Sequence, residues 1–333
     1  MVGLVLAFLI SFALTLIGVP LFMRFYKRMH ISGQQMHEDV HQHAAKAGTP
    51  TMGGTVFVLI PGLVSLIFAI SLKLFHATYL VLALVFGIYA IVGFLDDFLK
   101  IFRHINEGLK PWQKFLAQAI LGFVVWGIFV YQHKPDVIDV FGQAIHLGFL
   151  FPFFLILWLV GFSNAVNLTD GIDGLATISV SISLVAYGLI AIFNHQFDVL
   201  LVILTTLGGL LAFFVFNKKP AAIFMGDVGS LALGAFLAIL SVVLHAEWTL
   251  LLIGFVYIIE TISIMLQVSF FKLTKRLYGE GRRIFAMTPI HHHFELGGWS
   301  GKGEAWSEWQ VDYLWWSVTA GMSLLAVLLY IFI

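Results

Sequence analysis

Long apolar stretches separated by short polar segments recur along the whole chain. A helix needs about 20 apolar residues to cross a bilayer, and ten stretches approach or reach that length. They lie near residues 2–23, 53–72, 75–95, 113–132, 147–163, 174–193, 197–216, 228–246, 249–271 and 313–333. The pattern predicts an all-α integral membrane protein with ten transmembrane helices. No long linker or internal repeat divides it, so we expect one polytopic domain over residues 1–333.

The positive charges predict how these helices are oriented. The chain has 18 Lys and Arg residues, and all but Lys73 and Lys134 fall in alternate connecting segments or at their edges. Those segments are residues 24–52, 96–112, 164–173, 217–227 and 272–312. Because positive residues are retained on the cytoplasmic side, we expect these segments inside and both termini outside. The first stretch has its positive residues after it, which is the reverse of a signal peptide.

Composition excludes several classes of protein. The chain is 60% hydrophobic and 11% charged, far from the composition of a soluble domain. Its formal net charge is zero, so nucleic acid is not an expected partner. Because cysteine is missing, the chemistry uses no disulfide, thiolate or Cys-ligated metal. No P-loop or dinucleotide-binding glycine motif occurs.

Aspartates gather where predicted helices meet the cytoplasmic side. The first cluster, Asp96 and Asp97, ends the third apolar stretch. Carboxylates at membrane depth are costly and indicate a polar site. Adjacent helical residues point about 100° apart, so one aspartate is expected to hold a cation and the other to handle a proton or substrate. Alternatively, Lys100 simply pairs with Asp96 across one helical turn.

A second cluster combines amides and carboxylates at a regular spacing. Its members recur every third residue, at Asn164, Asn167, Asp170 and Asp173. In a tight helical turn they would line one stripe, and Gly171 would let the backbone approach a ligand closely. Such a stripe suits a sugar or a base. The alternative is that Asp170 or Asp173 caps the next helix.

A third cluster places Asp227 between Gly226 and Gly229 at the start of a predicted helix. Helix N-termini favour anions such as phosphates. An aspartate beside phosphates implies a bridging Mg²⁺, because like charges would otherwise repel. A plain N-cap is the alternative.

Polar residues in two further segments suit phosphate binding. His291, His292 and His293 are consecutive, which is poor geometry for tetrahedral zinc, so we expect imidazoles that contact a diphosphate. The segment from Lys46 to Gly54 adds a lysine, hydroxyls and a glycine turn for the same purpose.

Taken together, these motifs resemble the phospho-N-acetylmuramoyl-pentapeptide-transferase family, within the polyprenyl-phosphate N-acetylhexosamine-1-phosphate transferases. The resemblance covers nearly the whole chain and is carried by Gly48–Gly54, Phe94–Asp97, Asn164–Gly174, Phe224–Ser230 and Pro289–Glu295. It implies a Mg²⁺-dependent, usually homodimeric enzyme of the bacterial plasma membrane with a cytoplasmic active-site cleft. The donor would be UDP-MurNAc-pentapeptide, the acceptor undecaprenyl phosphate, and the products lipid I and UMP, in the first membrane step of peptidoglycan synthesis.

The resemblance and the clusters together predict the site residues. The expected catalytic residues are Asp96, Asp97, Asp227 and His291, with Asp97 and Asp227 as metal ligands. The expected substrate-binding residues are Lys46, Thr51, Lys100, Asn164, Asn167, Asp170, Gly171, Ile172, Asp173, Asn217, Phe224, Ser230, His291, His292 and His293. Residues 297–310 depart from the family pattern, being longer and richer in Gly and Trp than expected.

Two other functions are compatible with parts of the pattern. A related enzyme that transfers N-acetylglucosamine phosphate shares the aspartate clusters, although Thr49–Gly53 and the three histidines favour the muramoyl branch. An ion-coupled transporter also carries intramembrane carboxylates, but it binds near the bilayer midplane through broken helices. The sequence leaves open whether transfer takes one step or passes through a covalent aspartyl phosphate.

Overall fold

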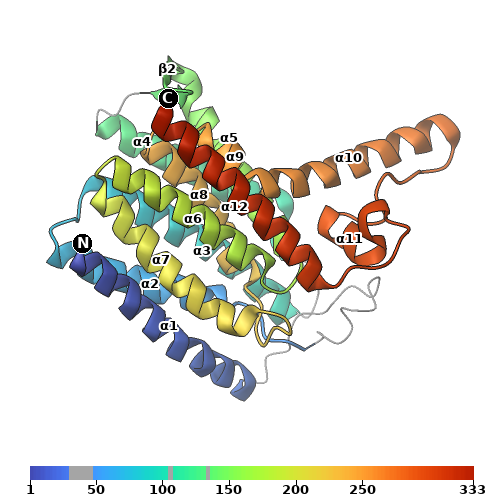
Figure 1. Cartoon of the computed structure of the whole chain (residues 1–333), viewed down its shortest axis with the longest axis horizontal. Coiled ribbons are helices and arrows are strands. Elements are labelled where there is room, and N and C mark those ends of the chain that lie inside the picture. The colour runs from blue at the N-terminus through green and yellow to red at the C-terminus, as the bar shows by residue number, and fades with distance from the viewer. Residues whose placement is uncertain (30–47, 104–107, 133–135) are drawn as a thin grey trace.

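The computed structural model describes residues 1–29, 48–103, 108–132 and 136–333 (Figure 1). The helices are α1 (Val2–Arg28), α2 (Gly54–Ser71), α3 (Ala77–Arg103), α4 (Pro111–Tyr131), α5 (Phe151–Thr169), α6 (Leu175–Phe193), α7 (Phe197–Asn217), α8 (Gly226–Val243), α9 (Thr249–Ile253), α10 (Phe255–Tyr278), α11 (Ile290–Gly297) and α12 (Glu308–Phe332). Short 3₁₀ helices are η2 (Gly148–Leu150) and η3 (Gly298–Ser300), and two strands are β1 (Val137–Val140) and β2 (Gln143–His146).

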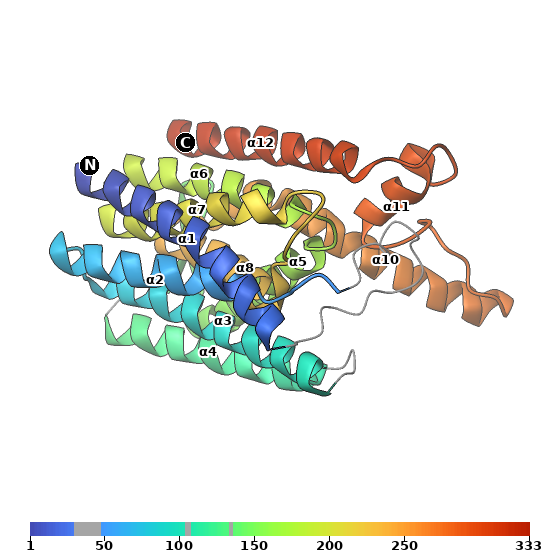
Figure 2. The same cartoon turned by 90° about the horizontal axis from the view of Figure 1, so that it is seen from below.

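Ten helices in the described ranges are long and apolar enough to cross a membrane. This confirms the predicted all-α membrane architecture. The helices run roughly side by side, and both termini lie at the same end of the bundle (Figure 2). The chain crosses the bundle three times, in α1, α2 and α3, before it reaches the first aspartate pair. This pair therefore lies at the end of the bundle opposite the termini.

The core of the bundle is α8, which packs against both α3 and α5. Most of α8 is buried inside the protein, whereas α1, α4, α10 and α12 expose broad apolar faces suited to lipid. Close approach to α3 depends on Gly93, because a Cβ there would lie 2.1 Å from the Asp227 carbonyl oxygen. This contact sets α3 against the start of α8, where both carry aspartates.

Several predicted spans differ in extent from the structure; the span predicted at 75–95, for example, continues to Arg103 as α3. The span predicted at 249–271 is wrong as one helix, because the chain breaks at Gly254 between α9 and α10. A Cβ on Gly254 would lie 2.7 Å from the Phe162 ring and 2.7 Å from the Leu250 carbonyl oxygen, so this position leaves no room for a side chain. The span predicted at 147–163 ends too early, because α5 continues to Thr169. Its polar last turns resemble a loop in hydropathy, but they are buried among neighbouring helices.

A small β-hairpin was not predicted from the sequence. β1 and β2 pair antiparallel, and Phe141 and Gly142 form the turn with φ angles of 52° and 76°, as a two-residue hairpin of type I′ requires. The Phe141 ring packs on Trp248, with centroids 4.6 Å apart. Beneath the hairpin, the buried Glu247 accepts a hydrogen bond from the Asp139 N–H at 3.0 Å. The hairpin is thereby fixed to the α8–α9 corner.

Candidate active site

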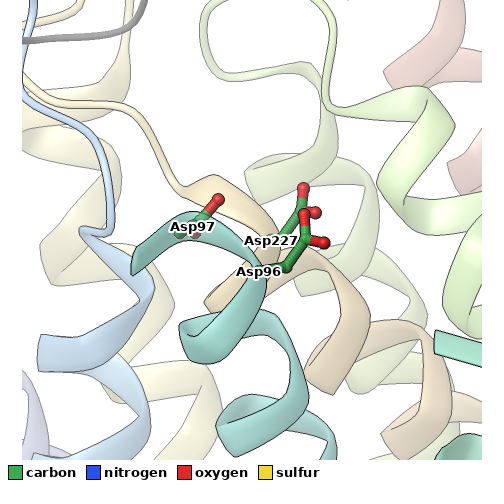
Figure 3. Close-up of side chains that lie close together, drawn as sticks. All are labelled: Asp96, Asp97 and Asp227. Atoms are coloured by element: carbon green, nitrogen blue, oxygen red, sulfur yellow. The ribbon is translucent and has the colours of Figure 1, made fainter. Parts of the chain in front are cut away.

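Three carboxylates from two helices form the centre of the candidate site. Asp96 and Asp97 lie near the end of α3, and Asp227 lies in the first turn of α8. One oxygen from each lies within 4.8 Å of the other two. In Figure 3 the Asp96 and Asp227 carboxylates lie next to each other, and Asp97 projects from a different side of α3. The adjacent aspartates therefore point in different directions, as predicted.

The backbone holds Asp96 and Asp97 separately. The Leu109 N–H donates to Asp96 Oδ1 at 2.8 Å, whereas the Val228 N–H donates to Asp97 Oδ2 at 3.2 Å. Asp97 therefore accepts from the first turn of α8, and Asp96 accepts from the segment before α4. The two carboxylates have different environments, which suits different chemical roles.

Two lysines bridge Asp96 and Asp227. Lys100 Nζ lies 2.6 Å from Asp96 Oδ2 and 3.1 Å from Asp227 Oδ2. Lys114 Nζ, from α4, lies 3.1 Å and 2.7 Å from the same two oxygens. The simple helical pair of Lys100 with Asp96 exists, but it is only one part of this four-residue network. The charges join α3, α4 and α8 at one point.

Sequence reasoning counted Lys114 only as a topological charge and missed it as a site residue. Its signal was available, because Lys114 lies inside the fourth apolar stretch, where an ionisable residue indicates function. The predicted alternative role of Asp227 as an N-cap is wrong. The N-cap of α8 is Met225, with no side-chain cap.

Asn167 orients the remaining oxygen of Asp227. Its Nδ2 donates to Asp227 Oδ1 and to Ser230 Oγ, each at 2.8 Å. Ser230 in turn donates to the Gly226 carbonyl at 3.0 Å. Asp227 thus has an amide donor on one oxygen and two ammonium groups on the other.

The residues of this cluster fit a hard divalent cation. Carboxylate oxygens are the ligands that Mg²⁺ prefers, and the three aspartates form the group of metal-ligand side chains found among the described residues. Two lysines face three carboxylates, so the cluster keeps a formal excess of negative charge. Asp97 and Asp227 stay the predicted ligands; the lysines do not distinguish among the aspartates, because they contact Asp227 as well as Asp96.

The predicted stripe of residues 164, 167, 170 and 173 is wrong. The segment is an α-helix that ends at Thr169, so residues three apart drift around it and Asp173 lies beyond its end. Asn164 Nδ2 donates to the Val160 carbonyl at 2.8 Å and to Gln118 Oε1 at 3.3 Å, whereas Asn167 reaches Asp227. Neither aspartate caps the next helix, because its N-cap is Gly174 with φ 84°.

Asp170 follows α5 and faces several charges. Burial, together with the negative charges of Asp227 and Asp173 and against the opposing effect of His291, raises the pKa of its carboxyl to about 7. Asp170 is therefore partly protonated near neutral pH, which lowers its repulsion of an anionic ligand. Electrostatics thus link the end of α5 both to the aspartate cluster and to the histidines.

Asp173, one of the predicted substrate-binding residues, lies where three segments meet. Asp173 Oδ2 accepts from the Ala221 N–H at 2.9 Å, and the Asp173 N–H donates to Glu308 Oε2 at 3.3 Å. Lys219 Nζ lies 3.2 Å from Glu308 Oε1. Asp173 therefore anchors the α7–α8 loop. Glu308, at the start of α12, is a further residue that sequence reasoning missed.

The other predicted pocket residues belong to the same framework. Ile172 is buried in a cluster with Phe294 and Trp315. Asn217 accepts from Thr177 Oγ1 at 2.6 Å and donates to the Ile223 carbonyl at 3.1 Å. The half-buried Phe224, the buried Thr51 and Gly171 lie in the loops around the cluster. Lys46 lies outside the described residues.

The three histidines have three different environments. His291 Nδ1 lies 3.1 Å from Glu260 Oε2, His292 Nδ1 lies 2.6 Å from Glu295 Oε2, and His293 Nδ1 accepts from the Ala286 N–H at 3.1 Å. Rings held in this way do not converge on one metal ion. Glu260, a single acid within an apolar stretch, was also missed by sequence reasoning.

The Gly- and Trp-rich residues 297–310 pack onto the histidine segment. Phe294 stacks on Trp306 with centroids 5.3 Å apart, and it also contacts Trp299 at 5.2 Å. The Trp306 N–H donates to the Phe294 carbonyl at 3.1 Å. These residues thus form an aromatic cover on α11.

Comparisons with known proteins show the family of the chain. The model of glycosyl transferase family 4 matches residues 78–245, and the phospho-N-acetylmuramoyl-pentapeptide-transferase signature 1 matches residues 46–58. The chain is 59% identical over 319 residues to the phospho-N-acetylmuramoyl-pentapeptide-transferase of Streptococcus pneumoniae serotype 2, covering 96% of each chain. It is 56% identical over 326 residues to that of Lactococcus lactis subsp. cremoris, covering 98% of each. The chain therefore belongs to the phospho-N-acetylmuramoyl-pentapeptide-transferase family.

Proposed function

We propose that this protein transfers phospho-N-acetylmuramoyl-pentapeptide from UDP-MurNAc-pentapeptide to undecaprenyl phosphate, with Mg²⁺, and releases lipid I and UMP. The observation that carries the proposal is the carboxylate–lysine cluster of α3, α4 and α8 in a chain of this family. Transfer of a phosphoryl group depends mainly on positioning and electrostatic stabilisation. The cluster supplies both.

Each residue of the cluster has a role that follows from its contacts. Mg²⁺ held by Asp97 and Asp227 would supply positive charge for the donor diphosphate. Lys100 and Lys114 lie at the same oxygens of Asp96 and Asp227, so they are placed to stabilise the developing charge on UMP. Asn167 and Ser230 fix the orientation of Asp227.

The acceptor is a phosphate monoester, which is already anionic when it attacks phosphorus. Its second pKa is near 6, so removing the last proton is a small task for Asp96 or Asp97. Asp170, His291, His292 and His293 would contact the diphosphate. The loops that carry Lys46, Thr51, Asn164, Gly171, Ile172, Asp173, Asn217 and Phe224 would bind the rest of the donor.

The same proposal includes location and assembly. We place the protein in the bacterial plasma membrane as a single-domain homodimer, with both termini outside and the cluster facing the cytoplasm. The charge bias along the sequence supports this orientation.

Cysteine labelling tests the orientation, because the chain has no cysteine of its own. Ala144→Cys lies on the exposed hairpin, and Glu280→Cys lies on the exposed turn after α10. A membrane-impermeant maleimide should label only the first in intact cells and both after lysis. Labelling of only Glu280→Cys in intact cells would reverse the orientation.

Donor specificity separates the proposal from its nearest alternative. The purified protein is given undecaprenyl phosphate and either UDP-MurNAc-pentapeptide or UDP-GlcNAc, and UMP is measured. We expect UMP from the muramoyl donor alone. UMP from UDP-GlcNAc instead would assign the protein to the N-acetylglucosamine branch. If neither donor yields UMP from a folded sample while vesicles take up solute, the transporter alternative would replace the proposal.

A further inference from the structure

Glu260 is a buried acid within the apolar helix α10. Its Oε2 accepts a hydrogen bond from the His291 backbone N–H at 3.3 Å and lies 3.1 Å from the ring Nδ1 of the same residue. Both side chains are 0% exposed. When Glu260 is a carboxylate, it can only accept hydrogen bonds, so Nδ1 then carries the hydrogen. Glu260 therefore selects one form of the His291 ring.

The other ring nitrogen of His291 faces the end of α5. His291 Nε2 is buried and has no hydrogen-bond partner in the described part of the chain. A Cβ on Gly171 would lie 2.2 Å from it, so the ring reaches this position only because residue 171 is glycine. The neighbouring Asp170 interacts electrostatically with both His291 and Asp227. A buried polar atom without a partner thus points at the loop beside the aspartate cluster.

The neighbouring histidines do not share this arrangement. His293 Nδ1 accepts a hydrogen bond from the Ala286 N–H, so its hydrogen is on the other nitrogen. His292 pairs with Glu295 of its own short helix. His291 is thus placed between α10 and the end of α5. Two buried partners from different segments are costly to desolvate, which favours a functional role over simple packing.

We propose that Glu260 is a positioning residue for the transfer reaction. It holds His291 with Nδ1 protonated, so that Nε2 is the nitrogen that faces the diphosphate of the nucleotide donor. The diphosphate would bind beside the Asp170–Gly171 loop. This inference rests on the proposed function. A purely structural Glu260 would instead only fasten α11 to α10.

Enzyme kinetics distinguish these two roles. Glu260→Gln keeps the size of the side chain but removes its charge and adds a donor beside Nδ1. We expect kcat to fall by about ten- to a hundredfold, as for other residues that orient a functional imidazole, while KM for UDP-MurNAc-pentapeptide changes by less than about threefold. Glu260→Asp, which keeps a carboxylate, should retain more activity than Glu260→Gln.

A double-mutant cycle with His291→Gln supplies the decisive comparison. If Glu260 acts through His291, the double variant should be no slower than His291→Gln alone. The matched control is Ser263→Ala, a buried residue on the same helix that donates to the Glu260 carbonyl at 2.6 Å. Its activity should stay within about twofold of the native protein, by analogy with substitutions away from special contacts.

Three results would overturn the proposal: an unchanged kcat in Glu260→Gln, an effect confined to KM, or losses that add in the double variant. The inference is also separable from the proposed function. Nitrogen chemical shifts of ¹⁵N-histidine protein, assigned with His291→Gln, should show Nδ1-protonated His291 that changes in Glu260→Gln. Absence of UMP release by the native protein would refute the proposed function, whereas the wrong protonated nitrogen would refute the role of Glu260.

Discussion

Gly93 on α3 faces the start of α8 at a distance that leaves no room for a side chain. A Cβ at this position would lie 2.1 Å from the Asp227 carbonyl oxygen and 2.6 Å from the Val228 nitrogen. Ordinary contact begins at 3.4 Å, so Gly93→Ala requires the two helices to separate by about 1 Å. The obstructing atoms are backbone, so no side-chain rotation relieves the overlap. The separation would move Asp96 and Asp97 relative to Asp227.

The expected result is a large loss of activity with a smaller loss of stability. A misplacement of about 1 Å at a catalytic centre can cost about a hundredfold in rate, and overpacking in a core typically costs about 1–3 kcal/mol. UMP release and thermal unfolding of the purified variant measure the two effects. Gly87→Ala is the matched control, because a Cβ on this α3 glycine meets nothing within 4 Å. Both substitutions gain the same helix propensity, so their difference isolates the overlap. Gly93→Ala with activity within twofold of Gly87→Ala would refute the reasoning.

Three further predictions concern charges around the site and at the opposite end of the bundle. Lys114→Met should lower kcat by about a hundredfold, because one of the two cations at Asp96 and Asp227 is lost. The control Lys272→Met, on the exposed end of α10, should have near-native activity. Equal activities of the two variants would contradict the role of Lys114. Glu308→Gln should raise KM for the donor by about tenfold with kcat little changed, because Lys219 and the Asp173 loop lose their contacts with the Glu308 carboxylate. Substitution of the exposed Glu304 by Gln serves as the control. An effect on kcat alone would argue against a binding role for Glu308. Burial raises the pKa of Glu247 from 4.5 to about 7, so the folded state binds the Glu247 proton more tightly than the unfolded state does. The stability that this proton contributes is therefore lost as the pH rises from about 4.5 to about 7. The native protein should lose up to about 3 kcal/mol more than Glu247→Gln between pH 4 and pH 8, and identical pH profiles of thermal unfolding would disprove this.

The sequence was sufficient for features that depend on local composition. Apolar length identified the ten membrane helices, and costly charges at their ends marked Asp96, Asp97 and Asp227 as candidate site residues on one membrane face; the structure then joins them in one cluster. These features can be predicted locally, because a long apolar helix is stable only within a membrane. A carboxylate at the end of such a helix is costly unless it has a charged or hydrogen-bonding partner.

Features that depend on contacts between distant segments could not be read in the same way. The bridge from Lys114 to Asp227 joins residues 113 positions apart, and at Gly254 a side chain would contact the ring of Phe162 on the distant segment α5. The spacing of the second cluster suggested one face, but the position where α5 ends decided which side chains reach Asp227. Each outcome was fixed by packing, which a single sequence does not display.

The central claim is that the aspartate cluster carries a Mg²⁺-dependent transfer to a lipid phosphate. Release of UMP from UDP-MurNAc-pentapeptide and undecaprenyl phosphate, with and without Mg²⁺, tests it most directly in the native protein and in Asp227→Asn. The native protein should release UMP only with Mg²⁺, and folded Asp227→Asn should release almost none. Full activity without Mg²⁺, or substantial activity in folded Asp227→Asn, would contradict the claim.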